Sequence, residues 1–311
     1  MTEVKFDLKK KKVFVAGHNG MVGKEVIKEL SKESCIPIQV DRSKLDLLSQ
    51  DQVNNWFLIN KPDVVIICAA KVGGILANSK YPVDFLYNNL MIQSNIIHSS
   101  YMVKVKKLVF LGSSCIYPKH AKQPISEDQL LSGPLEPTNE PYAIAKISGI
   151  KLCQAYRNQY NCDFISAMPT NLYGPNDNFD LNNSHVIPAL IKKFINAKKN
   201  NIDHVVIWGS GLPKREFLHV NDCAKAILFL LKNYSGDNHI NIGYGKDISI
   251  KELALTIKDI IGYKGDLLFD ENKPDGTPRK LLCTKKINQL GWSPKLSLRK
   301  GLEDTILNAQ I

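Results

Sequence analysis

The chain has 311 residues, of which 44% are hydrophobic and 23% charged, a composition that is ordinary for a globular protein able to bury a substantial core. Its 41 Lys and Arg against 30 Asp and Glu give a formal net charge of +11, but these bases are dispersed and nowhere interleaved with aromatic residues, which argues against nucleic acid as the main partner. There is no apolar run of roughly 20 residues to cross a membrane, no secretory signal and no zinc-like spacing among the seven cysteines, so we expect a cytoplasmic protein without a metal site or membrane partner.

Short apolar runs alternate with amphipathic stretches through the first half of the chain. Helices are predicted at 21–33, 51–60 and about 82–103, and strands at 12–17, 36–40, 62–70, 107–114 and 163–169. Continuous apolar strands separated by helices indicate a parallel sheet that is covered on both faces. We therefore predict a doubly wound α/β (Rossmann) fold, whose ligands bind at the carboxyl ends of the strands.

The character of the sequence changes after Tyr173. The stretch 174–185 (GPNDNFDLNNSH) reads as a long functional loop, further strands are predicted at 204–208 and 239–243, and 273–280 (KPDGTPRK) forms another loop. We predict a dinucleotide-binding domain over residues 1–175, to which some later segments return. Residues 176–311 are predicted to form a smaller, mixed α/β lobe that binds substrate.

A glycine-rich turn, AGHNGMVG, follows the first predicted strand and opens the first predicted helix. Gly17 permits a tight turn, Gly20 lets the backbone approach a pyrophosphate, and Gly23 lets the helix pack closely. The helix N-terminus, with Met21 and Val22 in its first turn, would then stabilise phosphate charge. The context of strand, turn and helix favours a dinucleotide site over a purely structural turn.

Two neighbouring residues give opposite indications about which dinucleotide binds. Asp41, 18 residues after Gly23, could accept a hydrogen bond from the ribose 2′-hydroxyl of NAD. Arg42 could instead pair with the 2′-phosphate of NADP. From these residues alone the choice stays open.

Tyr142 and Lys146 stand four residues apart in NEPYAIAKISGIK. On a helix they share a face, so a phenol and an ammonium can reach one site, where the cation would lower the tyrosine pKa. Such a pair by itself is more often a solvated helix face. The dinucleotide turn upstream favours a pair that transfers protons instead.

With the turn, the Tyr/Lys pair and GSSCIYP, the chain resembles the extended short-chain dehydrogenase/reductases. CAAKVGGI, LEPTNEPYAIAKI, MPTNLYGP, NSHVIPALI, WGSGLPKREFLHV and KPDGTPRKLL follow in order and resemble the GDP-L-fucose synthase family. The resemblance implies a homodimer that epimerises GDP-4-keto-6-deoxy-D-mannose at carbons 3 and 5 and then reduces the 4-keto group with NADPH.

The resemblance also implies roles for five residues. Tyr142 would protonate the carbon-4 oxygen, Lys146 would hold the nicotinamide ribose, and Ser113 would hydrogen-bond the same carbonyl. Cys115 and His185 would exchange the protons at carbons 3 and 5. A thiol and an imidazole both titrate near enough to neutral pH for this task, and which of them acts as the acid stays open.

Contacts to cofactor and substrate follow from the same motifs. Substrate contacts are expected at Lys193, Trp208, Arg215 and Asp275. Cofactor contacts are expected, beyond the glycine turn, at Arg42, Leu111, Gly112, Ser113, Ser114, Lys146, Pro169, Thr170, Asn171, Leu172 and His185. The resemblance makes NADP the expected cofactor. Asn19 departs from a family pattern that can carry arginine there, so how strictly NAD is refused stays open.

Other functions remain possible at this point. A nucleotide-sugar 4-epimerase would not need both Cys115 and His185, and a 4,6-dehydratase would be expected to carry acidic residues beside Ser113. A catalytically inactive dinucleotide sensor is disfavoured by the intact Ser113, Tyr142 and Lys146.

Overall fold

A six-stranded parallel sheet forms the larger part of the computed structural model, which describes residues 6–180, 184–273 and 275–309. The strand order is β2-β1-β3-β4-β5-β9, so the chain reverses its direction of progress between β1 and β3. At such a switch point the loops separate and leave room for a ligand at the carboxyl ends of the strands. The strands are β1 (Lys12–Ala16), β2 (Ile36–Ile38), β3 (Val64–Ile67), β4 (Lys107–Leu111), β5 (Phe164–Pro169) and β9 (Ile240–Ile242).

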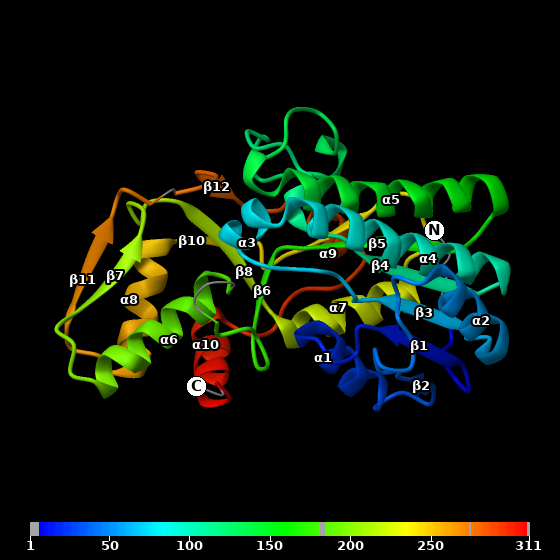
Figure 1. The fold of residues 1–311 in the computed structure, drawn as a ribbon, viewed down its shortest axis with the longest axis horizontal. Helices are drawn as coiled ribbons and strands as arrows, with labels where there is room; N and C mark the ends of the chain where they lie inside the picture. The colour runs from blue at the N-terminus through cyan, green and yellow to red at the C-terminus, as the bar shows by residue number, and fades with distance from the viewer. Residues whose placement is uncertain (1–5, 181–183, 274, 310–311) are drawn as a thin grey trace.

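Helices cover both faces of this sheet (Figure 1). Packed apolar clusters lie on each face, one containing Val26 and Leu230 and the other Phe57, Ile96 and Ile150. The predicted doubly wound α/β fold is thereby confirmed. The first face carries α1 (Met21–Leu30) and α7 (Val220–Asn233), and the second carries α2 (Gln50–Asn60), α4 (Asn89–Met102) and α5 (Glu140–Tyr160).

The helix predicted over about 82–103 is not uniform. Its first part, Asp84–Asn88, is a π-helical turn, and α4 continues from it. The wider turn places Phe85 in the interior, where its ring meets the ring of Tyr142 edge-on at 6.2 Å between centroids. Such wide turns recur near functional sites.

A smaller lobe of mixed strands and helices lies beside the sheet, at the left of Figure 1. In it, β8 pairs in parallel with β6 and β12 and antiparallel with β10, while β7 pairs with β11. A third apolar cluster, with Phe194, Ile207 and Leu253, fills its interior. The elements are β6 (Asn171–Tyr173), α6 (Val186–Lys199), β7 (His204–Trp208), β8 (Lys214–His219), β10 (Asp247–Ser249), α8 (Ile250–Ile261), β11 (Asp266–Asp270), β12 (Arg279–Lys280) and α10 (Leu298–Leu307).

The chain passes between sheet and lobe several times. After β8 it returns to the sheet as α7 and β9 and then leaves again for β10. The predicted boundary at residue 175 therefore marks only the first of these crossings, and residues beyond it contribute to both parts. The remaining elements of the described residues are the short helices α3 (Ile75–Lys80) and α9 (Lys285–Gln289) and the 3-10 turns Ser114–Ile116, Glu127–Gln129 and Pro137–Asn139. No helix within the described ranges has the length and apolar character needed to cross a membrane.

The carboxylate of Glu216, which is fully buried in β8, joins these crossings. Its Oε1 accepts the N–H of Gly245 at 2.6 Å and its Oε2 accepts the N–H of Leu282 at 3.0 Å. The Glu216 carbonyl accepts from the side chains of Thr170 at 3.3 Å and Asn171 at 2.8 Å. Burial raises the pKa of this carboxyl, and the backbone donors oppose that shift by stabilising the ionised form. One residue thus fixes three connecting segments.

Replacing Glu216 should therefore loosen the connection between sheet and lobe. We expect Glu216→Ala to lower the free energy of unfolding by about 3 kcal/mol, because two buried N–H groups lose a charged acceptor. Urea and thermal unfolding followed by circular dichroism would measure the change. The matched control is Glu271→Ala at an exposed carboxylate, for which a change within about 0.5 kcal/mol is expected; an equal effect of the two substitutions would contradict the role of Glu216.

Candidate active site

The glycine turn has the geometry that a dinucleotide requires. Gly17 has φ +84°, and a Cβ there would lie 2.6 Å from the Ala69 nitrogen; a Cβ on Gly23 would lie 2.1 Å from the Gly17 carbonyl oxygen. Gly20 occupies the N-cap of α1 without a side-chain cap, and the first turn has no acidic residue. The backbone N–H groups of Met21, Val22 and Gly23, ahead of the bond from Lys24 to the Gly20 carbonyl at 2.9 Å, are thus available to a phosphate, with the helix dipole behind them.

The other residues predicted to contact the cofactor lie along the same edge of the sheet. Leu111, Gly112 and Ser113 follow or end β4, and a Cβ on Gly112 would collide with Met168 at 2.2 Å, so the two strands approach closely here. Four more lie where β5 passes into β6: Pro169, Thr170, Asn171 and Leu172. Their place beside the glycine turn is consistent with cofactor contacts, which remain a prediction.

Arg42 lies in an exposed turn after β2, directly behind Asp41. The carboxylate of Asp41 accepts a hydrogen bond from the Asn19 side chain at 3.1 Å, so it is bound to the glycine turn. Both candidate selectors of NAD or NADP therefore lie next to the turn that would hold the pyrophosphate.

Tyr142 and Lys146 project from the first turns of α5 towards the ends of β4 and β5. The Lys146 ammonium is buried, donates to the Leu111 carbonyl at 2.8 Å and lies 5.9 Å from the centre of the Tyr142 ring. Ser113 accepts from the backbone N–H of Cys115 at 3.4 Å and lies near enough to the Tyr142 phenol to lower its pKa. Ser113 consequently links the expected acid, Tyr142, to the expected epimerising thiol.

The ionisation of Tyr142 differs from the expectation drawn from the sequence. Burial raises the pKa of Tyr142, the neighbouring Cys115 raises it further, and the hydrogen bond from Ser113 opposes both. The lowering expected from Lys146 is absent: its ammonium donates to the Leu111 carbonyl, and burial sets the direction of the shift. A raised pKa keeps the phenol protonated at neutral pH, which is the state that an acid needs.

Cys115 and His185 come from different parts of the molecule. Cys115 is 6% exposed within the short helix after β4; burial raises its pKa, and Lys280, Ser113 and Lys146 oppose that shift. His185 stands at the N-cap of α6, exposed to solvent yet close enough to protein for desolvation to lower its pKa. Within the described residues no hydrogen bond joins His185 to the Ser113 cluster, so their cooperation stays a prediction.

The four residues predicted to contact substrate form two pairs on the lobe. Lys193 donates to the Val206 carbonyl at 2.8 Å and lies 5.4 Å above the ring of Trp208, which is 43% exposed. Arg215 donates to the backbone oxygen of Asp275 at 3.3 Å. A cation beside an open indole, and a second cation beside a loop, are suited to a phosphorylated ligand with a flat base.

Lys280 is a site residue that the sequence reasoning did not identify. It pairs with Arg215 in the register of β12 and β8, and its charge interacts with Cys115 and Glu136. Burial lowers its pKa, while Cys115 and Glu136 oppose that shift. Lys280 thereby connects the catalytic cluster with the substrate side; its position in KPDGTPRKLL was the available signal, but the two-residue strand was not predicted.

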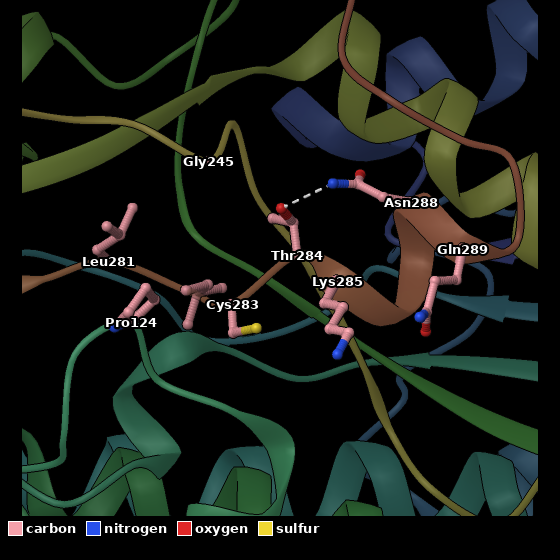
Figure 2. A pocket seen from close by; sticks show the side chains of 9 residues that line it. Pro124, Gly245, Leu281, Cys283, Thr284, Lys285, Asn288 and Gln289 are labelled. Carbon is pink, nitrogen blue, oxygen red and sulfur yellow. Dashed lines mark hydrogen bonds between the residues drawn. The ribbon is translucent and has the colours of Figure 1, made fainter.

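Figure 2 shows a separate pocket of about 520 Å³ where the chain crosses from the lobe to the sheet. Thr284 accepts from Asn288 at 3.2 Å within it. It contains none of the predicted site residues, and its only charged side chain is Lys285, so the chemistry lies elsewhere. Its lining comprises Pro124, Gly245, Leu281, Leu282, Cys283, Thr284, Lys285, Asn288 and Gln289.

The buried Lys146 yields a prediction about pH. Burial lowers the pKa of Lys146 to about 8, so the ammonium is present below pH 8 and is lost as the pH rises through that value. If Lys146 holds a ribose of the cofactor, the affinity for NADP should fall by about tenfold between pH 7 and pH 9.5. Calorimetric titration would measure it. Lys146→Arg, which stays charged, should flatten the profile; parallel profiles would contradict the assignment.

Comparisons with known proteins identify the family. Residues 13–243 match the NAD dependent epimerase/dehydratase family. The chain is 59% identical to a GDP-L-fucose synthase of Sinorhizobium fredii, covering 94% of this chain and 93% of the relative, and 52% identical to that of Escherichia coli, covering 96% of both. A GDP-L-fucose synthetase of Naegleria fowleri bound to NADP superposes with a TM-score of 0.91 at 29% identity, covering 99% and 96%. The chain therefore belongs to the NAD-dependent epimerase/dehydratase family of the extended short-chain dehydrogenases/reductases.

Proposed function

We propose that this protein makes GDP-L-fucose from GDP-4-keto-6-deoxy-D-mannose, by epimerisation at carbons 3 and 5 followed by reduction at carbon 4. The observation that carries this proposal is the position of the Ser113 hydroxyl, which accepts from the backbone N–H of Cys115 at 3.4 Å and lies near enough to the Tyr142 phenol to affect its pKa. A reducing acid and an epimerising thiol would then act on one substrate carbonyl. Relatives at 52% and 59% identity are named for the same synthesis.

The first stage needs a proton to leave a carbon and another to arrive from the opposite face. The 4-keto group acidifies the C–H bonds at carbons 3 and 5, and Ser113 with Tyr142 would stabilise the negative oxygen that forms. Because the pKa of Cys115 is raised and that of His185 is lowered, the free protein holds a thiol and a neutral imidazole. That pair has one transferable proton, so one group can give a proton while the other takes one.

The second stage needs a proton on the carbon-4 oxygen. Bound NADPH supplies the hydride to carbon 4. Tyr142, protonated because its pKa is raised, gives its phenolic proton to the oxygen, and Ser113 holds that oxygen in place. The Lys146 ammonium lies 5.9 Å from the ring centre, where it would hold the nicotinamide ribose of the cofactor.

The substrate side accommodates a nucleoside diphosphate sugar. Arg215 and Lys193 would contact the diphosphate, Trp208 would offer its exposed face, and Asp275 would meet the substrate from the last loop. Support comes from their placement on one lobe, with Lys280 between Arg215 and Cys115. These four contacts rest on the resemblance together with that placement.

NADP is the cofactor, as in the family, and the glycine turn with the open N-terminus of α1 fits its pyrophosphate.

We place the protein in the cytoplasm, where nucleotide sugars and NADPH are available. We also expect a homodimer formed through α4 and α5, whose outer surface exposes Met102, Ile144 and Tyr160, with Tyr87 exposed on the π-helical turn before α4. Sedimentation equilibrium would test the dimer, and a monomer at micromolar concentration would contradict it.

The direct test supplies GDP-4-keto-6-deoxy-D-mannose with NADPH and identifies the sugar by NMR. We expect stoichiometric oxidation of NADPH and GDP-L-fucose as the product. In the matched variant Cys115→Ser, the rate at which solvent deuterium enters carbon 3 and carbon 5 should fall by about 100-fold or more. A folded protein that oxidises no NADPH, or yields a sugar with carbons 3 and 5 unchanged, would refute the proposed function.

A further inference from the structure

Tyr117 is a buried tyrosine that the chemistry described above does not use. It directly follows the short helix Ser114–Ile116, which carries Cys115, and its side chain points into the protein. The phenol donates to the Asn241 Oδ1 at 2.5 Å, and its oxygen lies 2.9 Å from the His239 Nε2. Asn241 lies in β9 and His239 directly precedes that strand. The phenol therefore joins the segment that carries the thiol to the edge strand of the large sheet.

Asn241 fixes the direction of each of these bonds. Its Nδ2 donates to the carbonyls of Ile125 at 3.0 Å and Cys283 at 3.3 Å, so its Oδ1 is the acceptor that faces the phenol. The phenol has one hydrogen, which it gives to Asn241, so His239 donates its Nε2–H to the phenolic oxygen. Burial lowers the pKa of His239 to about 4, which keeps this ring neutral at pH 7. The Tyr117 oxygen is thus paired both as donor and as acceptor.

The anchor for the phenol is itself held by further buried groups. The backbone N–H of Asn241 donates to the Glu127 Oε1 at 3.1 Å, and the Glu127 Oε2 lies 3.5 Å from the Lys286 ammonium. The side chains of Asn241, His239 and Glu127 are all buried. A buried polar network whose members are paired favours one arrangement, because its bonds are directional and costly to break. Apolar packing around the same residues has no such directional preference.

The helix that carries Cys115 depends on such an anchor because its own hydrogen bonds are local. The N–H of Cys115 reaches the Ser113 hydroxyl at 3.4 Å, and the N–H of Ile116 reaches the Ser113 carbonyl at 3.2 Å. At its start, the N–H of Gly112 donates to a carbonyl of β5 at 2.9 Å, which fixes the Ser113 end. The phenol of Tyr117 fixes the opposite end. The position of Cys115 is therefore set from both ends of a short segment.

We propose that Tyr117, held by Asn241 and His239, is a positioning residue that sets the Cys115 thiol for proton exchange at the sugar ring. Tyr117 does not touch the substrate; it acts through Cys115. This inference rests on the proposed function, in which Cys115 exchanges protons at carbons 3 and 5. The anchoring of the thiol can nevertheless be measured without any sugar.

The first measurement is the rate at which iodoacetamide alkylates Cys115 in the ligand-free protein. Tyr117→Phe removes only the hydroxyl, so the segment should open more often and the alkylation rate should rise by about fivefold or more. Mass spectrometry would follow the tryptic peptide 108–119, whose sole cysteine is Cys115. Peptide 152–157 contains the buried Cys153 of α5 and is the internal reference, whose rate should stay unchanged.

The second measurement is the entry of deuterium into carbons 3 and 5 of GDP-4-keto-6-deoxy-D-mannose in D₂O. NADP+ replaces NADPH here, because the first stage needs no hydride. Tyr117→Phe should slow exchange at saturating sugar by about tenfold, since a misplaced reacting group loses rate, while the affinities for NADP+ and GDP stay within about twofold by calorimetry. A purely structural role would weaken binding and exchange together.

Variants at His239 give an independent comparison. His239→Leu removes the donor to the phenol and should change alkylation and exchange in the same directions by about threefold. His239→Gln keeps an N–H for the phenol and should restore both rates. The control is Tyr263→Phe, which removes a hydroxyl that donates to the Ile202 carbonyl at 2.6 Å in the lobe, and should alter neither rate. Circular dichroism and unfolding midpoints would establish that each variant is folded.

The outcomes separate this inference from the proposed function. Unchanged alkylation of Cys115 in a folded Tyr117→Phe variant would overturn the inference, as would equal behaviour of His239→Leu and His239→Gln. A fall in the affinity for GDP that matches the fall in exchange would also overturn it. Faster alkylation in Tyr117→Phe, together with a wild-type protein that exchanges no deuterium, would instead refute the proposed function and leave the anchoring of the thiol established.

Discussion

Glu216 carries a carboxylate buried between the sheet and the lobe, and both of its oxygens accept backbone N–H groups from segments that cross between them. A buried carboxylate is stable only with such partners, and the partners in turn would be left unpaired without it. The Glu216 carboxylate and the backbone N–H groups that it accepts therefore depend on each other for their burial. Glu216 positions β8, and with it Arg215, the neighbouring residue that faces the substrate side. Lys280 then pairs with Arg215 across the same small sheet.

The chemistry depends on how this frame brings β4, α5 and β12 together. Ser113 ends the β4 segment and contacts Tyr142 from α5, while the charge of Lys280 from β12 acts on Cys115. Burial dominates every ionisation in the cluster: it raises the pKa of Tyr142 and of Cys115 and lowers that of Lys146. The opposing contacts are few and specific. A protonated phenol beside a thiol whose cation neighbours favour the thiolate is suited to a reaction with two distinct proton transfers.

Much of the fold was predictable because its elements have strong local patterns. The apolar runs of β1, β3, β4 and β5, the glycine turn with its demand for small residues, and the spacing of Tyr142 and Lys146 all read directly from the sequence. The motifs also indicated the family, which the comparisons confirmed.

Other features depend on contacts that no local pattern encodes. The strand β12 has two residues and no periodicity, so the approach of Lys280 to Cys115 could not be foreseen. The π-helical turn before α4 carries residues that an α-helix could equally carry, and it differs from one in the spacing of its backbone hydrogen bonds. The sign of the Tyr142 shift was wrong in the sequence argument, because spacing reports a cation nearby but neither the burial of the phenol nor the donation of the Lys146 ammonium to Leu111.

The central claim is that one site performs two separable proton transfers, with Tyr142 needed only for the second. Tyr142→Phe in D₂O with GDP-4-keto-6-deoxy-D-mannose and NADPH tests it most directly, by NMR of the sugar and absorbance of NADPH together. The account predicts that deuterium still enters carbons 3 and 5 while oxidation of NADPH slows by about 100-fold or more. Loss of exchange and reduction to the same extent, in a variant that still binds NADP, would contradict it.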